Sequence, residues 1–200
     1  MVMVYNKSIE TKKIIVKAFE KLFYYKGYKN TSLSDILTSC NIPKGSFYYY
    51  FKKGKEELLL EVIKYHTENL IKFFSYTVDD LSIFKLKTFF FQFFTSIENN
   101  QFHGGSPLGN IAIELSDIND QVRLELSSSY RKIELRFSFF LTTLKSNYPE
   151  KYHHVEPELY ARILVSLLEG TMLKLKIEKK EDAITDFLSF YDKIFKSDKQ

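Results

Sequence analysis

The segment from Thr31 to Phe51 constrains the fold more than any other part of the chain. It begins with hydroxyl residues that cap helices well, followed by a short apolar stripe at helical spacing. The stripe ends at Cys40, and Asn41 then supplies a side chain that tolerates the left-handed backbone of a tight turn. Pro43 opens a second, polar and aromatic segment from Lys44 to Phe51. Two short helices joined by a tight turn within about twenty residues predict a helix-turn-helix.

The second of these helices is too short and too polar to form a core by itself. Its outward side chains must therefore serve something other than packing. In a helix-turn-helix such side chains hydrogen-bond to bases and phosphates in the major groove of DNA. We expect Phe47 and Phe51 to be exceptions that anchor the helix on the first helix of the chain, whereas Tyr50 fits either role.

Charge is distributed unevenly along the chain. Residues 1–65 carry 12 Lys, no Arg and 6 acidic residues, a balance of +6, whereas residues 66–200 carry 17 basic and 19 acidic residues, a balance of −2. A basic end on a slightly acidic remainder is expected when that end meets a polyanion. A solvated lysine-rich surface explains the charge almost as well, so charge supports nucleic-acid binding without establishing it.

Helical periodicity continues outside the helix-turn-helix. A helix is predicted from Ser8 to Lys26, with Gly27 suited to a left-handed stop, and a long connecting helix from Lys55 to Phe74. Further helices are predicted over residues 83–98, 107–116, 121–145, 157–177 and 181–195. No stretch alternates polar and apolar residues as a strand does. We therefore predict an all-α protein of about nine helices.

Three stretches carry a resemblance to a known family: Ile14 to Tyr28, Lys44 to Phe51, and Lys55 to Leu58. Over residues 11–64 the chain resembles the TetR family of bacterial repressors, and the second stretch matches the family's third helix nearly position by position. In two places the chain departs from the family pattern. Asn41 stands where the family usually has Gly, and the loop before Lys55 is one residue longer than the commonest version. Both positions affect the angle of the third helix.

The resemblance implies which residues contact DNA. Those implied to hold phosphates are Thr31 or Ser32, Tyr48 and Lys55. Those implied to lie closest to base edges are Lys44, Gly45, Ser46 and Tyr49. Phosphate contacts set the register and the salt dependence of binding, while base contacts set the sequence preference.

Weaker signals in the C-terminal part concern a ligand. Residues 104–116 resemble a glycine-rich motif that, in one branch of the family, begins a helix lining the ligand cavity, although a glycine turn capping a helix explains the pattern equally well. Ser106 stands where many relatives have Cys, so thiol-based sensing is not supported. Polar residues set among apolar neighbours and a phenylalanine stripe give candidate ligand contacts, for which a buried hydrogen bond and a packed core are the alternatives. These candidates are Phe90, Phe94, Asn110, Glu114 and Glu169.

Other classes of site have no support in the sequence. His103, His153 and His154 do not recur at metal-ligand spacing, and no nucleophile elbow or phosphate-binding glycine loop occurs, so we predict no metal, no cofactor and no enzymatic activity. A single Cys cannot form an intramolecular disulfide. Neither a signal sequence nor an apolar run of about 18 residues is present, so we expect a cytoplasmic protein with no membrane partner.

The resemblance implies a ligand-responsive transcriptional regulator. Residues 1–54 would form a helix-turn-helix DNA-binding domain, and residues 55–200 a ligand-binding and dimerisation domain. In the family, a helix matching Leu159 to Leu175, with Glu169 and Gly170, pairs with the last helix in a four-helix dimer interface. The expected protein is a repressor that binds a palindromic double-stranded operator as a homodimer and is released by a small apolar or amphipathic ligand.

The sequence supports two other classes of function less well. A helical interaction protein would use its phenylalanine-rich core and basic end for a protein or membrane partner, and binding to anionic vesicles without competition from DNA would favour it. An enzyme carrying a helix-turn-helix module lacks any supporting residue.

Overall fold

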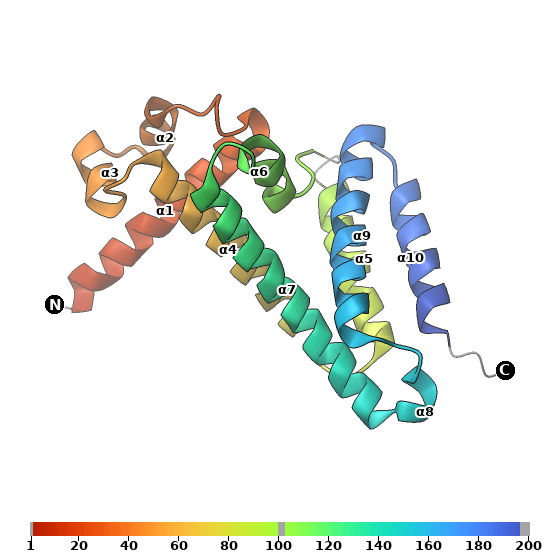
Figure 1. The fold of residues 1–200 in the computed structure, drawn as a ribbon. Coiled ribbons are helices and arrows are strands. Elements are labelled where there is room, and N and C mark those ends of the chain that lie inside the picture. Colours follow the sequence, from red (N-terminus) through yellow and green to blue (C-terminus); the bar gives the residue numbers. More distant parts are fainter. Residues whose placement is uncertain (1, 100–102, 197–200) are drawn as a thin grey trace. The chain divides into compact units, whose positions relative to one another are not determined.

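The computed structural model describes residues 2–99 and 103–196, with side chains from residue 10 of the first helix onward. All regular secondary structure in these residues is α-helical, which confirms the predicted fold class (Figure 1). The helices in this described part of the chain are α1 (Val2–Lys26), α2 (Leu33–Cys40), α3 (Lys44–Tyr50), α4 (Lys55–Thr77), α5 (Ile83–Glu98), α6 (Pro107–Leu115), α7 (Asp120–Asn147), α8 (Pro149–Tyr152), α9 (Pro157–Glu178) and α10 (Asp182–Phe195).

One helix of the described chain was not predicted. α8 lies in a stretch that the sequence indicated as a break between two longer helices, and it has four residues with Pro149 in its first turn. Four residues are too few to show helical periodicity, so the sequence did not reveal it. The connecting helix α4 also ends three residues later than predicted, at Thr77.

The chain forms two compact units. The first unit comprises Met1–His66 and Asn110–Leu126, and the second comprises Thr67–Gly109 and Ser127–Gln200. These units do not coincide with the predicted boundary after residue 54, because α4, α6 and α7 each contribute residues to both units. An apolar stripe shows that a helix is buried on one face, but it does not show which elements cover that face.

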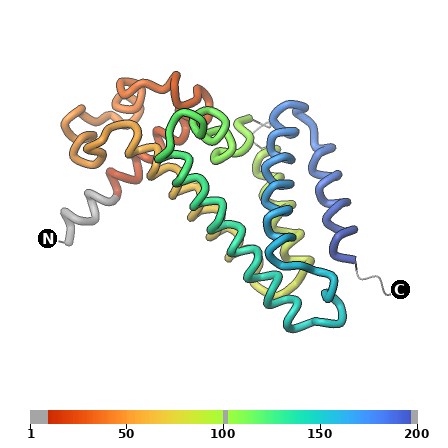
Figure 2. The backbone as a smooth tube through the Cα atoms, viewed as in Figure 1, coloured from red at the N-terminus to blue at the C-terminus, as the bar shows by residue number. Residues whose placement is uncertain are grey.

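The helix ends of the first unit follow from local chemistry. Ser32 caps α2 in a reciprocal capping box with Asp35. At the other end of α2, Asn41 adopts the left-handed conformation with φ 52°, as expected for the turn. Gly27 has φ +77° after α1, which confirms the predicted left-handed stop. The backbone trace in Figure 2 shows the resulting turn between α2 and α3.

The core of the second unit is rich in phenylalanine. Within this unit α5, α9 and α10 lie side by side (Figure 1). The ring centroid of Phe187 from α10 lies 4.8 Å from that of Phe90 and 5.0 Å from that of Phe94, both on α5. The latter two side chains have no exposed surface. No helix in the described part of the chain has the length and hydropathy needed to cross a membrane.

Candidate functional site

α3 is held to the first unit by its aromatic residues. Phe47 and Phe51 are fully buried, with ring centroids 5.4 Å apart, and the Lys12 ammonium of α1 lies 5.7 Å from the centre of the Phe51 ring. These contacts confirm the prediction that the two phenylalanines are core anchors. The anchored face of α3 leaves its opposite face open.

The open face of α3 carries the residues expected at base edges. Tyr49 is 72% exposed, and Lys44 and Gly45 are exposed as well, while Ser46 is partly exposed. A Cβ added at Gly45 would have no heavy atom within 4 Å, so the surface there is bare. Tyr48, expected at a phosphate, is 40% exposed. A short helix with one anchored face and one open face can approach a groove of DNA closely.

The two hydroxyl residues before α2 have different environments. Thr31 is fully buried, and its Oγ1 donates to the carbonyl oxygen of Gly27 at 2.7 Å. Ser32 is exposed, and its Oγ accepts from the backbone N–H of Asp35 at 3.1 Å. Of the two hydroxyls named as alternatives for a phosphate contact, that of Ser32 is the accessible one.

Lys55 holds the turn between α1 and α2. Its ammonium donates to the carbonyl oxygens of Tyr28 at 2.8 Å and Thr31 at 2.9 Å, and lies 3.9 Å from the centre of the Tyr28 ring. Burial lowers the pKa of Lys55, while the negative charge of Glu114 raises it. Because an ammonium has three N–H donors, these two hydrogen bonds leave one donor for a phosphate.

Glu114 belongs to the same turn. Its two carboxylate oxygens accept from the backbone N–H groups of Tyr28 at 2.9 Å and Lys29 at 2.7 Å. A Cβ at Gly27 would lie 3.1 Å from Glu114 Oε2, so the carboxylate fits closely against a glycine. Two residues expected to bind a ligand, Glu114 and Asn110, thus lie in the first unit with the helix-turn-helix. A sequence pattern does not identify hydrogen-bond partners 85 residues away.

Glu169, the third polar residue expected to bind a ligand, lies in a partly buried polar cluster of the second unit. It hydrogen-bonds to Ser106 and Tyr130. Burial raises the pKa of Glu169, while these two hydrogen bonds lower it. A Cβ at Gly109 would lie 2.6 Å from Glu169 Oε2, so the carboxylate packs directly on the first turn of α6. Sequence reasoning singled out Glu169 but did not identify Tyr130 as its partner.

The outer face of α9 is apolar and open. Exposed apolar side chains recur along it at helical spacing: Leu159 (38% exposed), Ile163 (39%), Leu173 (47%) and Ile177 (69%). A Cβ at Gly170 on this helix would have no heavy atom within 4 Å. A groove of about 460 Å³ lies between α9 and α10 and includes Gly170 and Phe190. Apolar patches of this kind mark interaction surfaces.

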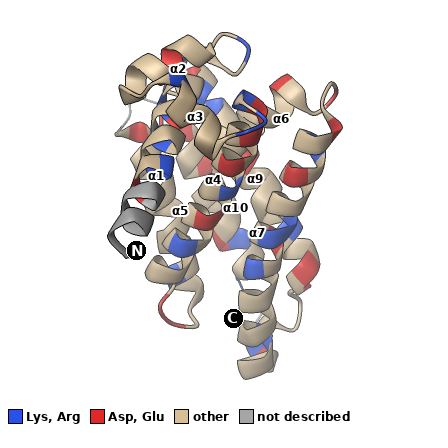
Figure 3. Cartoon of the chain, turned by 90° about the vertical axis from the view of Figure 1, so that its left-hand side faces the viewer, with Lys and Arg blue, Asp and Glu red and all other residues tan. Residues whose placement is uncertain are grey.

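Lysines recur along α1, the helix that precedes the helix-turn-helix (Figure 3). Two of them form ion pairs: Lys12 with Glu61 of α4 at 2.9 Å and Lys26 with Asp35 of α2 at 3.6 Å. The remaining lysines of α1 contribute to the surplus of positive charge in residues 1–65.

Two family models match the chain. One, described as bacterial regulatory proteins of the tetR family, covers residues 15–62, which include the helix-turn-helix. The other, described as a tetracyclin repressor-like C-terminal domain, covers residues 82–191.

Curated relatives match along most of their length. A helix-turn-helix transcriptional regulator from the lacX 3′ region of Lactococcus lactis subsp. lactis is 30% identical, with 87% of each chain covered. The transcriptional repressor DhaR of Mycobacterium sp. (strain GP1) is 26% identical, covering 88% of this chain and 87% of its own. The negative regulator of the biofilm operon icaADBC, IcaR of Staphylococcus aureus (strain Newman), is 30% identical, covering 87% and 89%.

Solved structures share the fold. A regulatory protein TetR from Rhodobacter sphaeroides superposes with a TM-score of 0.81 at 22% identity, covering 92% of this chain and 97% of that one. The reduced form of E. coli NemR superposes with a TM-score of 0.80 at 22% identity, covering 94% of this chain and 99% of that one. The relatives are transcriptional regulators and not enzymes, in agreement with the predicted lack of catalytic activity.

Proposed function

The chain belongs to the TetR family of bacterial helix-turn-helix transcriptional regulators, and from this premise we propose that it is a repressor that binds a palindromic operator as a homodimer. The open face of α3 is the observation that carries the proposal. Two relatives, DhaR and IcaR, are described as a repressor and a negative regulator, which supports repression.

In this proposal α3 enters the major groove. Lys44, Gly45, Ser46 and Tyr49 meet base edges, which is supported by their position on the exposed face of a helix anchored by Phe47. Ser32, Tyr48 and Lys55 bind phosphates. The hydroxyl of Thr31 is enclosed, so Thr31 contributes by accepting a hydrogen bond from Lys55 through its carbonyl.

The homodimer forms through the open apolar face of α9. Exposed isoleucine and leucine side chains on this face, together with the groove beside Gly170, support a helix-against-helix interface. A twofold dimer presents two copies of α3 to half-sites one helical turn apart, about 34 Å. In this proposal residues 1–54, together with Lys55 at the start of α4, bind DNA, and the rest of residues 55–200 bind the effector and the second subunit.

The effector is a small apolar or amphipathic molecule bound in the second unit. For release, the effector must favour a spacing of the two α3 helices that misses successive major grooves. α4 is the candidate for transmitting this change, because its residues up to His66 belong to the first unit and those from Thr67 to the second. The protein works in the cytoplasm, where the operator is.

The proposal is tested by selecting bound sequences from a random DNA pool and titrating the best one in gel shifts. Gly45→Ala adds a methyl group to the face that approaches the bases, and we expect an affinity loss of about tenfold or more. Because Ala favours helix over Gly by about 0.5–1 kcal/mol, the variant should fold at least as well as the parent.

The matched control is Ser189→Ala, which changes an exposed residue of α10 in the second unit. It should bind the selected DNA as the parent does. The proposal fails if the parent chain shows no preference over competitor DNA at moderate salt, or if Gly45→Ala binds with unchanged affinity.

A further inference from the structure

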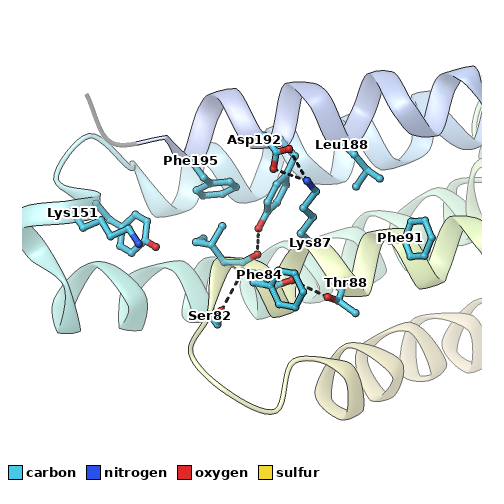
Figure 4. Close-up of a pocket in the computed structure, with 12 residues that line it drawn as sticks. Ser82, Phe84, Lys87, Thr88, Phe91, Lys151, Leu188, Asp192 and Phe195 are labelled. Atoms are coloured by element: carbon cyan, nitrogen blue, oxygen red, sulfur yellow. Dashed lines mark hydrogen bonds and ion pairs between the residues drawn. The ribbon is translucent and has the colours of Figure 1, made fainter. Parts of the chain in front are cut away.

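A pocket of about 570 Å³ lies in the second unit among α5, α8 and α10 (Figure 4). This volume falls in the range of small-molecule sites, roughly 300–1,000 Å³. None of the five residues that the sequence suggested as ligand contacts lines it. The pocket is lined by Ser82, Ile83, Phe84, Lys87, Thr88, Phe91, Lys151, Tyr152, Leu188, Tyr191, Asp192 and Phe195.

Aromatic rings on the wall of the pocket face water. Phe84 is 72% exposed and Phe91 is 53% exposed, and their separation of seven residues puts them on one face of α5. Leu188 and Phe195 of α10 add apolar surface to the same pocket. Covering these side chains removes apolar area from water, so the pocket favours a ligand with an apolar body.

Three hydroxyl groups of the wall, those of Tyr191, Thr88 and Ser82, form hydrogen bonds within the protein. Tyr191 Oη donates to the carbonyl oxygen of Ile83 at 2.8 Å, and Thr88 Oγ1 donates to the carbonyl oxygen of Phe84 at 2.9 Å. Ser82 Oγ accepts from the backbone N–H of Phe84 at 3.2 Å. Because these groups already have partners within the protein, we look to the charged side chains of the pocket for its specificity.

Of the charged side chains that line the pocket, one cation has no counter-charge in the described part of the chain. Lys87 and Asp192 face each other between α5 and α10, with Nζ 2.7 Å and 2.6 Å from the two carboxylate oxygens, so they neutralise one another (Figure 4). Lys151 of α8 lies toward one end, with Nζ 5.3 Å from the centre of the Tyr152 ring. Within the described residues its ammonium has no acidic partner within 4.0 Å.

We propose that this pocket binds a small amphipathic anion. The anionic group, a carboxylate or sulfonate, pairs with Lys151, and the apolar body covers Phe84 and its apolar neighbours. A cationic ligand is disfavoured because the carboxylate in the pocket, that of Asp192, is already held by Lys87.

We infer further that this anion is the effector, and this step rests on the proposed function. α10 supplies Leu188 and Asp192 to this pocket and supplies Asp186 and Phe190 to the groove beside α9. A ligand held between α5 and α10 therefore acts on the same helix that borders the proposed dimer face. The binding site itself does not depend on this regulatory role.

The test uses the full-length chain and the fluorescent probe 1-anilinonaphthalene-8-sulfonate, without DNA. We expect saturable binding at one site per chain, displaced by decanoate and much more weakly by the neutral decan-1-ol. Lys151→Gln should weaken decanoate binding at least about fivefold, because it removes the unpaired cation. Phe84→Ala should weaken the binding of the probe and of both competitors. Because the Phe84 side chain is exposed in the parent, folding does not depend on it.

Lys193→Gln is the matched control, since Lys193 is an exposed residue of α10 outside the pocket, and its affinities should equal those of the parent. The proposal is overturned if no saturable binding occurs, if decan-1-ol competes as well as decanoate, or if Lys151→Gln and Phe84→Ala bind as the parent does.

Gel shifts with the selected DNA separate the two proposals. If decanoate binds the pocket but does not change the affinity for DNA, the pocket is a binding site but its ligand is not the effector. If the parent chain binds decanoate through Lys151 but shows no preference for any DNA sequence, the proposed function is wrong and the binding site stands.

Discussion

Two charged side chains of opposite sign fix the turn between α1 and α2. Glu114 accepts from the backbone N–H groups of Tyr28 and Lys29, and Lys55 donates to the carbonyl oxygens of Tyr28 and Thr31. Backbone groups that no helix satisfies are thereby paired, which matters because an unpaired buried polar group is costly. The position of α2 relative to α1, within the first unit, thus depends on residues outside the helix-turn-helix itself.

Glu114→Gln tests this role. The amide keeps one acceptor oxygen but turns an N–H₂ group toward one of the two backbone N–H donors, so a hydrogen bond is lost. We expect the free energy of unfolding to fall by about 1–2 kcal/mol in urea titrations. Glu125→Gln is the control, because Glu125 lies in the same unit and its carboxylate has no hydrogen bond or ion pair with any described residue. Equal stability of the two variants would contradict the role.

His66 gives the first unit a pH dependence. Its Nε2 lies 3.6 Å from Glu20 Oε1, and burial lowers its pKa from 6.5 to about 4. The unfolded chain therefore takes up a proton at a higher pH than the folded chain does, and stability falls as the pH drops from 6.5 toward 4. The full loss is about 3 kcal/mol at most.

His66→Gln should flatten the stability profile in this pH window, measured by urea unfolding at pH 7 and at pH 5. His153→Gln, at an exposed histidine, should keep the profile of the parent. A variant at His66 that retains the full pH dependence would show that another group is responsible.

At the scale of elements, α9 is apolar on two faces. One face is buried in the second unit by residues such as Leu164, Leu168 and Leu175, which have at most 1% exposure. The other face keeps Ile163 and Leu173 exposed. A helix of a monomer normally has one apolar stripe, so the second stripe indicates a further partner, and a second copy of this chain is the partner that the proposed function requires.

Ile163→Glu should convert the dimer to a monomer, because it places a charge on the apolar face proposed as the interface. Sedimentation velocity at micromolar concentration would measure the change. Ile113→Glu, at a 77% exposed isoleucine of α6, is the matched control and should stay dimeric. A parent chain that sediments as a monomer, or a dimer unaffected at Ile163, would contradict the assigned face.

At the scale of the whole molecule, charge is segregated along the chain. Residues 1–65 have a balance of +6 and residues 66–200 a balance of −2. The positive part includes all residues proposed to bind DNA. The proposed DNA binding should therefore depend strongly on salt, whereas ligand binding to the second unit should depend on it much less.

The operator affinity is expected to fall about a thousandfold between about 50 mM and about 200 mM salt, the dependence typical of roughly six phosphate contacts. Filter binding or fluorescence anisotropy over this range measures the slope. Decanoate titrations at the same salt concentrations serve as the internal control. An operator affinity that is insensitive to salt would exclude phosphate contacts as a major source of binding.

The sequence by itself determined the features that depend on near neighbours in the chain. Helical periodicity and capping residues are local, so they predicted the long helices, the left-handed Asn41, and the buried anchors Phe47 and Phe51. The resemblance added the residues proposed to contact DNA. α8 was not predicted because a single helical turn is too short to show helical periodicity.

Only the tertiary structure decided which distant groups meet. It joined Glu114 to a turn 85 residues earlier, grouped Asn110–Leu126 with the first unit, and formed a pocket between α5 and α10 that no pattern suggested. The physical reason is that the environment of a side chain is set by the packing of whole helices against one another. The position of a polar residue on an apolar stripe indicates that the residue is buried. Its hydrogen-bond partner, however, depends on elements that are far away in the sequence.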